Sequence, residues 1–134
     1  MPYTLTWEPP NGACRTFSGG VTGVDLLGSL VELTGAAQFD GLRYSILIFS
    51  GVTGLEADRS TLEDIAAVDY GAYDCNSRFV SAIVADGELA GQLLRRFDGL
   101  NFSRIPRRFF STEADARAWI DSILSANRPG MGWV

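Results

Sequence analysis

The basic side chains of this sequence are all arginines, and this restricts the chemistry that the chain can perform. The sequence contains eleven arginines, no lysine and no histidine. Without histidine, a Ser-His-Asp or Cys-His nucleophile and an imidazole metal ligand are excluded. Without lysine, a Schiff base and the lysine of a phosphate-binding Walker A loop are excluded. The remaining reactive groups are carboxylates, tyrosines, cysteines and arginines.

Six of the arginines lie between residues 95 and 117, with only three acidic residues among them, although the chain has a net charge of −5. Arginine binds phosphates and carboxylates through parallel N–H donors. We therefore interpret Arg104, Arg107 and Arg108, with Arg59 upstream, as a candidate surface for an anion or a partner protein. Because Arg107 and Arg108 are neighbours on a predicted strand, they point to opposite faces and cannot share one patch. The alternative is a set of solvated charges on an edge strand.

The best remaining cluster for catalysis consists of Asp69, Tyr70, Tyr73 and Asp74, which fall within about one helical turn of one another. No other reactive group is expected to converge on this cluster, and the polar end of a helix accounts for it without chemistry. We therefore expect no enzyme activity, no cofactor and no metal site.

The overall composition is that of a globular protein, with 46% hydrophobic and 20% charged residues in 134. This length predicts one domain over residues 1–127, followed by a tail at 128–134. No apolar run is long enough to span a membrane, and the first ten residues do not resemble a secretion signal, so we expect a cytoplasmic protein. An acidic chain without a basic helix is not expected to bind nucleic acid. Cys14 and Cys75 match no metal-binding spacing and are expected to be buried, reduced thiols.

Alternating and continuous apolar runs predict the elements that position these residues. The predicted strands are 3–7, 13–19, 43–50, 78–85 and 104–110, and the helices begin near residues 22, 60, 86 and 112. The first two strands form an antiparallel hairpin, and the three later strand–helix units require parallel crossovers. The fold class is therefore α/β, with a mixed, mostly parallel five-stranded sheet and four helices. The strand at 43–50 should be central, because its apolar run suits a strand covered on both faces.

Capping boxes mark three of the helix starts, since a hydroxyl and a carboxylate three residues later can each satisfy a free backbone N–H. The predicted pairs are Thr22–Asp25, Ser60–Glu63, Thr61–Asp64 and Thr112–Asp115. In the first helix, apolar residues at 24, 27, 30, 31 and 33 predict a wide buried face, whereas residues 25, 29 and 32 predict a polar stripe.

The stretches "GLRYSILIFSGVT" and "RRFFSTEADARAW" carry a resemblance to a known family. They are similar to small bacterial uncharacterised proteins of the SpoIIAA-like or STAS superfamily, in which R-Y-x-I-x-x-F and F-x-T-x-x-x-A-x-x-W are frequent. This is the fold of bacterial anti-sigma-factor antagonists, and CRAL-TRIO lipid-transfer domains share it in part. The resemblance covers residues 3–124 and implies a SpoIIAA-like fold.

The resemblance also implies a role. Antagonists of this superfamily are phosphorylated on a serine of an Asp-Ser pair at the start of the helix after the central strand. The matching region here reads "EADRSTLEDI", which makes Ser60 and Thr61 the candidate phosphoacceptors, although Arg59 separates Asp58 from Ser60. The expected function is a non-catalytic regulatory module that contacts another protein or a second copy in a homodimer. The alternative is a CRAL-TRIO-like carrier, in which residues 24–33 wall a cavity for a hydrophobic or anionic small ligand.

Overall fold

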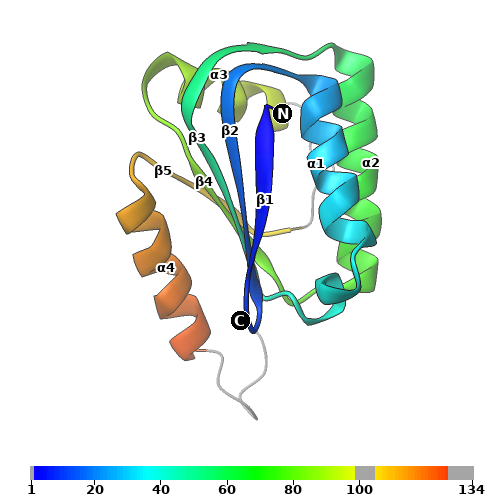
Figure 1. Cartoon of the computed structure of the whole chain (residues 1–134), viewed down its shortest axis with the longest axis vertical. Coiled ribbons are helices and arrows are strands. Elements are labelled where there is room, and N and C mark those ends of the chain that lie inside the picture. Colours follow the sequence, from blue (N-terminus) through cyan, green and yellow to red (C-terminus); the bar gives the residue numbers. More distant parts are fainter. Residues whose placement is uncertain (1, 99–104, 127–134) are drawn as a thin grey trace.

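The computed structural model describes residues 2–98 and 105–126, which form a sheet flanked by helices (Figure 1). In chain order the elements are β1 (Tyr3–Glu8), β2 (Gly12–Thr22), α1 (Gly23–Gly35), the 3-10 helix η1 (Ala37–Gly41), β3 (Tyr44–Glu56), α2 (Arg59–Cys75), β4 (Val80–Val84), α3 (Gly87–Asp98), β5 (Arg107–Phe110) and α4 (Glu113–Ala126). Arg104 and the predicted tail at 128–134 lie outside the described residues.

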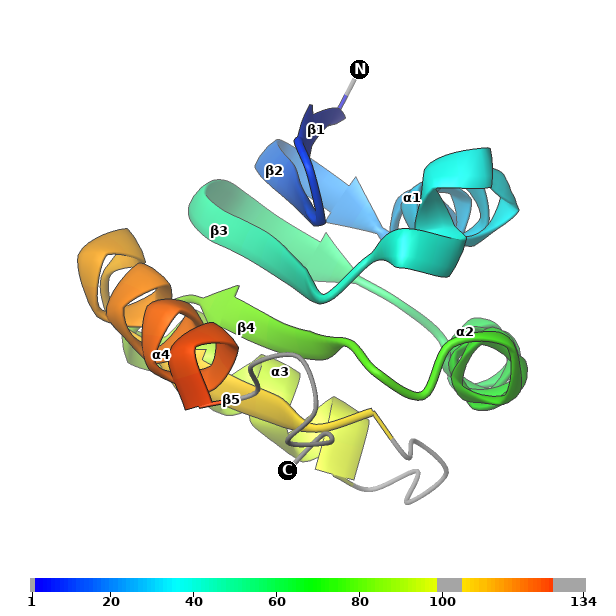
Figure 2. The same ribbon diagram turned by 90° about the horizontal axis from the view of Figure 1, so that it is seen from below.

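The strands form one sheet in the order β1-β2-β3-β4-β5. β1 is antiparallel to β2, and each of the other neighbouring pairs is parallel. The predicted fold class is therefore confirmed, with β3 inside the sheet and β5 at its edge. Figure 2 shows α1 and α2 side by side on one face and α4 on the other. None of the described helices is long and apolar enough to cross a membrane.

Alternate residues of the strands contribute to two cores on opposite faces of the sheet, as the period of a strand requires. The core toward α1, α2 and α3 includes Phe17, Leu30, Leu47, Leu62, Ile83 and Leu93. The core toward α4 includes Ile46, Val80, Val84, Ala116 and Ile120. β3 is thus covered on both faces, which explains its apolar sequence.

β2 and β3 are longer than the sequence pattern predicts. The predicted loop after Ser50 is wrong, because β3 continues to Glu56 and this extension pairs with β2 alone. The register of β2 and β3 shifts twice, and Gly19 adopts a φ of +68°, which favours glycine over any residue with a Cβ. The extension brings the starts of α1 and α2 next to each other.

The predicted inward face of α1 is wrong at three positions. Val24 and Val31 are 71% and 51% exposed, whereas Ser29 is completely buried. The helix turns a different side toward the sheet because Ser29 accepts a hydrogen bond from a buried arginine, Arg15, over 3.1 Å. A serine is tolerated inside when both its donor and its acceptor are used, and the Ser29 hydroxyl also donates to the Leu26 carbonyl.

The two cysteines lie in different environments. Cys14 is buried as predicted, and its burial raises the pKa of the thiol. The prediction for Cys75 is wrong, because it is the last residue of α2 and its thiol is exposed. No disulfide joins them.

Candidate functional site

The candidate phosphoacceptors Ser60 and Thr61 lie in the first turn of α2. The predicted capping boxes that start with them are wrong, because Asp58 is the N-cap and its Oδ1 accepts the Thr61 backbone N–H over 2.8 Å. That backbone hydrogen bond lowers the pKa of Asp58. The Ser60 side chain is exposed, and Arg59 forms a 3.2 Å ion pair with Glu63 on the surface. By contrast, the predicted box of Thr22 and Asp25 is confirmed.

An open hollow lies where the starts of α1 and α2 meet the end of β3. Its lining includes Gly23, Val24, Leu55, Asp58, Thr61 and Arg96. The Arg96 guanidinium donates to the Ala57 carbonyl over 3.0 Å and so links α3 to the segment between β3 and α2. The carboxyl ends of parallel strands commonly hold the binding sites of α/β proteins. The hollow therefore lies at the carboxyl-terminal end of the strands, where a partner or ligand would be expected to bind.

The close approach of the two helices depends on Gly23. A Cβ on this residue would lie 2.8 Å from Thr61 Cγ2 and 3.1 Å from Ala57 Cβ. We expect Gly23→Ala to lower the free energy of unfolding by about 1–3 kcal/mol, measured by urea unfolding. Gly28→Ala is the control in the same helix, because a Cβ there meets nothing within 4 Å, and alanine should stabilise the helix by up to about 1 kcal/mol. Destabilisation of similar size by both variants would contradict this packing.

The described arginines of the candidate anion surface lie apart. Arg107 faces α2 and forms an ion pair with Asp69 over 3.6 Å, with both side chains largely buried. Arg108 is exposed on the other face, where its guanidinium lies 5.5 Å from the centroid of the Phe110 ring. The prediction that these two neighbours point to opposite faces is therefore confirmed. Arg59 belongs to the start of α2, away from both.

The residues of the candidate catalytic cluster do not all face the same side of α2. Asp69 turns inward to Arg107, whereas Tyr70 is 48% exposed and Asp74 is exposed. Among the residues that the structure describes, no three cysteine or acidic side chains gather as metal ligands.

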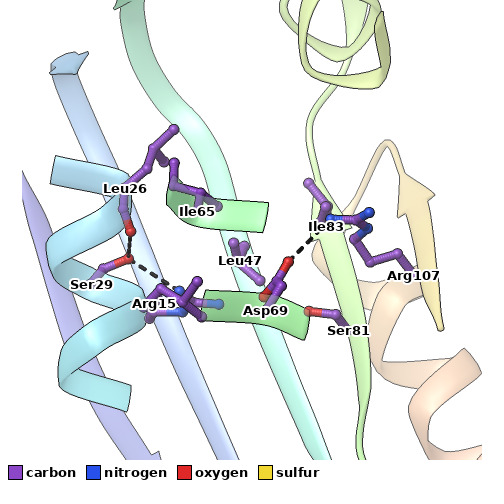
Figure 3. Close-up of a pocket in the computed structure, with 10 residues that line it drawn as sticks. Arg15, Leu26, Ser29, Leu47, Ile65, Asp69, Ser81, Ile83 and Arg107 are labelled. Carbon is purple, nitrogen blue, oxygen red and sulfur yellow. Dashed lines mark hydrogen bonds and ion pairs between the residues drawn. The ribbon is translucent and has the colours of Figure 1, made fainter. Parts of the chain in front are cut away.

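The sequence analysis missed a buried polar cluster around Arg15 (Figure 3). Arg15 is 5% exposed, and it donates to the hydroxyls of Ser29 and Ser45 over 3.1 and 3.3 Å. Burial lowers the pKa of Arg15 to about 10, so it remains charged at neutral pH. Burial likewise raises the pKa of Asp69, against the effect of Arg107 and Arg15. The alternation of "ACRTFSG" contained the signal, because residues 13, 15 and 17 must share one face.

A cavity of about 40 Å³ lies beside this cluster, between the sheet and α1 and α2. Ligand pockets usually measure about 300–1,000 Å³. The space is far too small for a lipid, although it is the place where the alternative carrier function would require one.

The arrangement of strands and helices is similar to that of known structures. Neither a protein-family model nor a curated protein sequence matches the chain. The unphosphorylated anti-sigma factor antagonist SpoIIAA is similar over 90% of this chain and 99% of its own, with a TM-score of 0.60 and 8% identity. The phosphorylated form of SpoIIAA, a Bacillus cell fate determinant, is similar over 88% of this chain and 98% of its own, with a TM-score of 0.57 and 10% identity. This chain has a SpoIIAA-like fold.

A third similar structure is an uncharacterised protein of the DUF3478 family from Shewanella loihica PV-4, which also has a SpoIIAA-like fold. It covers 88% of this chain and 91% of its own length, with a TM-score of 0.50 and 16% identity. At these identities the likeness shows the SpoIIAA-like fold alone, as the resemblance in the sequence predicted.

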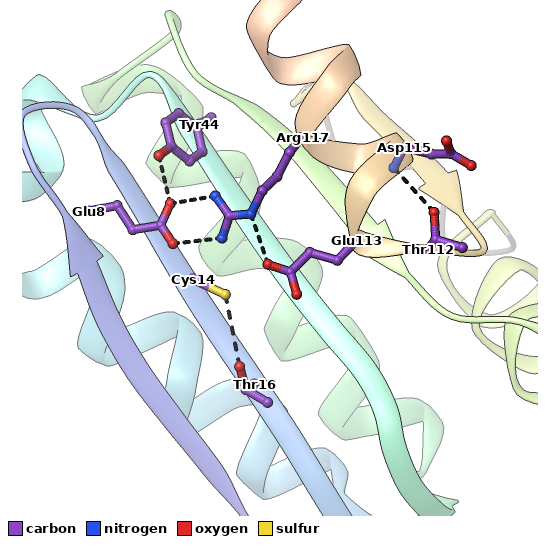
Figure 4. A network of polar contacts seen from close by, with 8 residues as sticks. All are labelled: Glu8, Cys14, Thr16, Tyr44, Thr112, Glu113, Asp115 and Arg117. Carbon is purple, nitrogen blue, oxygen red and sulfur yellow. Dashed lines mark hydrogen bonds and ion pairs between the residues drawn. The ribbon is translucent and has the colours of Figure 1, made fainter.

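In this SpoIIAA-like chain, a polar network holds α4 against the sheet (Figure 4). Arg117 of α4 donates two hydrogen bonds to the Glu8 carboxylate, over 3.0 and 2.8 Å. Tyr44 of β3 donates to the same carboxylate over 2.6 Å. The Arg117 hydrogen bonds lower the pKa of Glu8, whereas burial and the bond to Glu8 raise the pKa of Tyr44 to about 12. The network joins β1, β3 and α4 at one carboxylate.

Glu8→Gln should therefore remove an acid-dependent part of the stability. The lowered pKa of Glu8 means that its contribution is present above pH 4.5, the ordinary value, and is lost as the pH falls through the folded-state pKa. We expect the variant to be about 1 kcal/mol less stable than wild type at pH 7, and this difference to shrink as the pH falls below 4.5. Urea unfolding across this range measures the difference. Glu113→Gln, which removes the half-exposed second partner of Arg117, is the control with a smaller effect. A Glu8→Gln difference that does not change with pH would contradict the assignment.

Proposed function

We propose that this chain is a non-catalytic regulatory module that binds another protein through the outward surface of α1 and α2. We call the exposed residues of these two helices the α1/α2 face. The observation that carries the proposal is the exposure of Val24 and Val31, at 71% and 51%. They lie seven residues apart on one side of α1, with Gly28 between them, and Tyr70 of α2 is 48% exposed. Large apolar residues that a helical layer exposes to solvent are typical of a protein-binding surface.

The charge of the two helices that carry these apolar residues indicates the chemistry of the partner. The exposed charged residues of the two helices are Glu32, Glu63, Asp64 and Asp74, against Arg59 alone. Complementary charge steers a partner to such a surface and fixes its orientation. The partner should therefore present an apolar centre surrounded by basic side chains.

We further propose that phosphorylation of Ser60 or Thr61 regulates this binding. Ser60 is exposed in the first turn of α2, and Thr61 lines the hollow that also contains Val24. The positive end of α2 and Arg59 would tolerate a phosphate, while its charge would alter the edge of the α1/α2 face. SpoIIAA, whose fold is similar, has solved structures in unphosphorylated and phosphorylated forms.

The first experiment identifies proteins captured by the immobilised chain from the cells that contain it, and then measures binding of the purified pair. Val31→Arg places a positive charge in the apolar centre and should weaken the affinity by about tenfold or more. Ala118→Arg is the matched control, because Ala118 is an exposed alanine of α4 on the other face. Added salt should weaken the wild-type complex. A partner that binds Val31→Arg as tightly as wild type would contradict the proposed face.

The second experiment addresses the regulation alone. Intact-mass measurement and peptide mapping of the chain from its cells should detect phosphate on Ser60 or Thr61. Ser60→Ala with Thr61→Ala should abolish the modified form without changing the affinity of the unmodified protein for its partner. If no growth condition yields phosphate at either residue, the regulatory step is wrong, whereas the docking face is tested by the first experiment.

A further inference from the structure

A buried positive charge without an ion-pair contact to any described residue lies between the sheet and α1 and α2. Arg15 is 5% exposed, and the hydrogen-bond acceptors of its guanidinium are the neutral hydroxyls of Ser29 and Ser45. It forms no ion pair with any residue of the described chain. An arginine stays protonated even when buried, and a buried charge is costly unless it is paired. The site therefore favours a negative group close to Arg15.

The Nε atom of Arg15 is the donor that such a group would satisfy. Among the buried side-chain nitrogen and oxygen atoms of the described residues, it is the one without a hydrogen-bond partner. Buried N–H donors are nearly always satisfied, so an unsatisfied one indicates a missing partner. Arg15 lines the 40 Å³ cavity, so a partner in this space can reach the guanidinium.

The strand register adds further polar groups to the same cavity. Ser45, Ser81 and Arg107 are direct neighbours across β3, β4 and β5, and all three point toward α1 and α2. Ser81 and Arg107 line the cavity together with Asp69 of α2, as Figure 3 shows. Two guanidinium groups thus accompany one carboxylate. Asp69 forms its ion pair with Arg107 and interacts with Arg15 without an ion-pair contact, so the two positive charges share one negative charge.

We propose that this cavity binds a small monovalent inorganic anion of the size of chloride, held by the Arg15 Nε–H and the Ser81 hydroxyl. A water molecule would accept the hydrogen bond but would not supply the charge. Water needs roughly 10–15 Å³, so about 40 Å³ accommodates a small anion. Organic anions are excluded by size, since their pockets are about ten times larger. The proposal is independent of the proposed function, because it concerns the inner side of the helices.

Chloride is the probe for the first test. The unfolding temperature of the whole chain is measured while sodium chloride replaces sodium gluconate at constant ionic strength, since gluconate is too large for the cavity. A ligand that binds only the folded state stabilises it in a saturable way. We expect the unfolding temperature to rise with chloride and then level off, and bromide to act similarly. Identical unfolding temperatures in chloride and gluconate would overturn the proposal.

Variants separate this site from general salt effects. Arg15→Met should lose the chloride response, whereas Arg95→Met, which removes an exposed arginine of α3, should retain it. Asp69→Asn removes the one carboxylate of the cavity and should tighten chloride binding by about tenfold. If Arg15→Met does not fold, Asp69→Asn still decides the question, because an unchanged or weaker chloride response there would overturn the proposal.

A crystal grown with bromide locates the ion directly. The anomalous signal of bromide should lie within hydrogen-bond distance of Arg15 Nε. A water molecule at that position, or an Asp69 carboxylate turned to Arg15, would overturn the proposal. A bromide peak without any chloride effect in solution would mean binding at crystal concentration only, which also overturns it.

Discussion

Replacing Phe49 by alanine should lower the free energy of unfolding by about 4 kcal/mol. Phe49 of β3 is 1% exposed, and its ring stacks on the ring of Phe17 of β2 with centroids 4.8 Å apart. Both rings lie in the core that joins the sheet to α1, α2 and α3. Truncation removes the buried surface of one ring and leaves a cavity beside the other. Urea unfolding followed by circular dichroism measures the loss.

Two further variants show whether burial is the cause. Val24→Ala also removes apolar atoms, but from an exposed side chain, so its effect should stay within about 0.5 kcal/mol. Phe49→Leu retains most of the buried volume and should be less destabilising than Phe49→Ala. If Phe49→Ala lowers the free energy of unfolding by less than about 1.5 kcal/mol, the stacked rings of Phe17 and Phe49 do not make a major contribution to the stability of this core.

The strands were predictable because the pattern of apolar residues in each strand depends on whether helices cover one or both of its faces. In "YSILIFS", residues 44, 46 and 48 face α4, while residues 45, 47 and 49 face α1 and α2. Such a run is expected only for a strand between two layers, and the alternation of the first two strands similarly indicated an exposed hairpin edge. The order of elements then left few topologies, since parallel crossovers are right-handed.

The inward face of α1 was not predictable from its own residues. Helical periodicity places Ser29 on a polar stripe, but Ser29 is buried because Arg15, fourteen residues earlier on β2, donates to it. A contact between two elements cannot be deduced from the hydrophobicity of either one. For the same reason the periodicity wrongly predicted that Val24 and Val31 are buried. Their exposure now supports the proposal that the α1/α2 face binds a protein.

The start of α2 shows the limit of local signals at the candidate site. Asp58, Ser60 and Thr61 are all good N-cap residues, and each has a helix-compatible sequence after it. The extension of β3 to Glu56 leaves only Ala57 and Asp58 before the helix, so Asp58 becomes the cap. The resemblance correctly placed Ser60 and Thr61 in the first turn of this helix, although the exposure of Ser60 and the half-buried position of Thr61 required the structure.

Asn76→Ala should destabilise the protein by about 3 kcal/mol or more, because the side chain of Asn76 is the hydrogen-bond partner of three backbone groups. It is 5% exposed and follows α2 directly. Its Nδ2 donates to the carbonyls of Phe39 and Leu42, both over 2.8 Å, and its Oδ1 accepts the Arg78 N–H over 2.9 Å. Each buried backbone group left without a partner costs about 1–3 kcal/mol. Urea unfolding of the variant measures the sum.

Asn76→Asp tests whether the two donated bonds dominate, because it retains the acceptor and places a carboxylate against two carbonyl oxygens. The introduced carboxyl group should have a pKa above the ordinary value, since its charged form is repelled. The folded variant would then bind a proton at this carboxyl group more tightly than the unfolded variant does. The loss of stability relative to wild type should therefore be smaller at pH 4 than at pH 7. Ser77→Ala, at the exposed neighbouring residue, should have little effect. Full stability of Asn76→Asp at pH 7 would show that η1 does not depend on these donors.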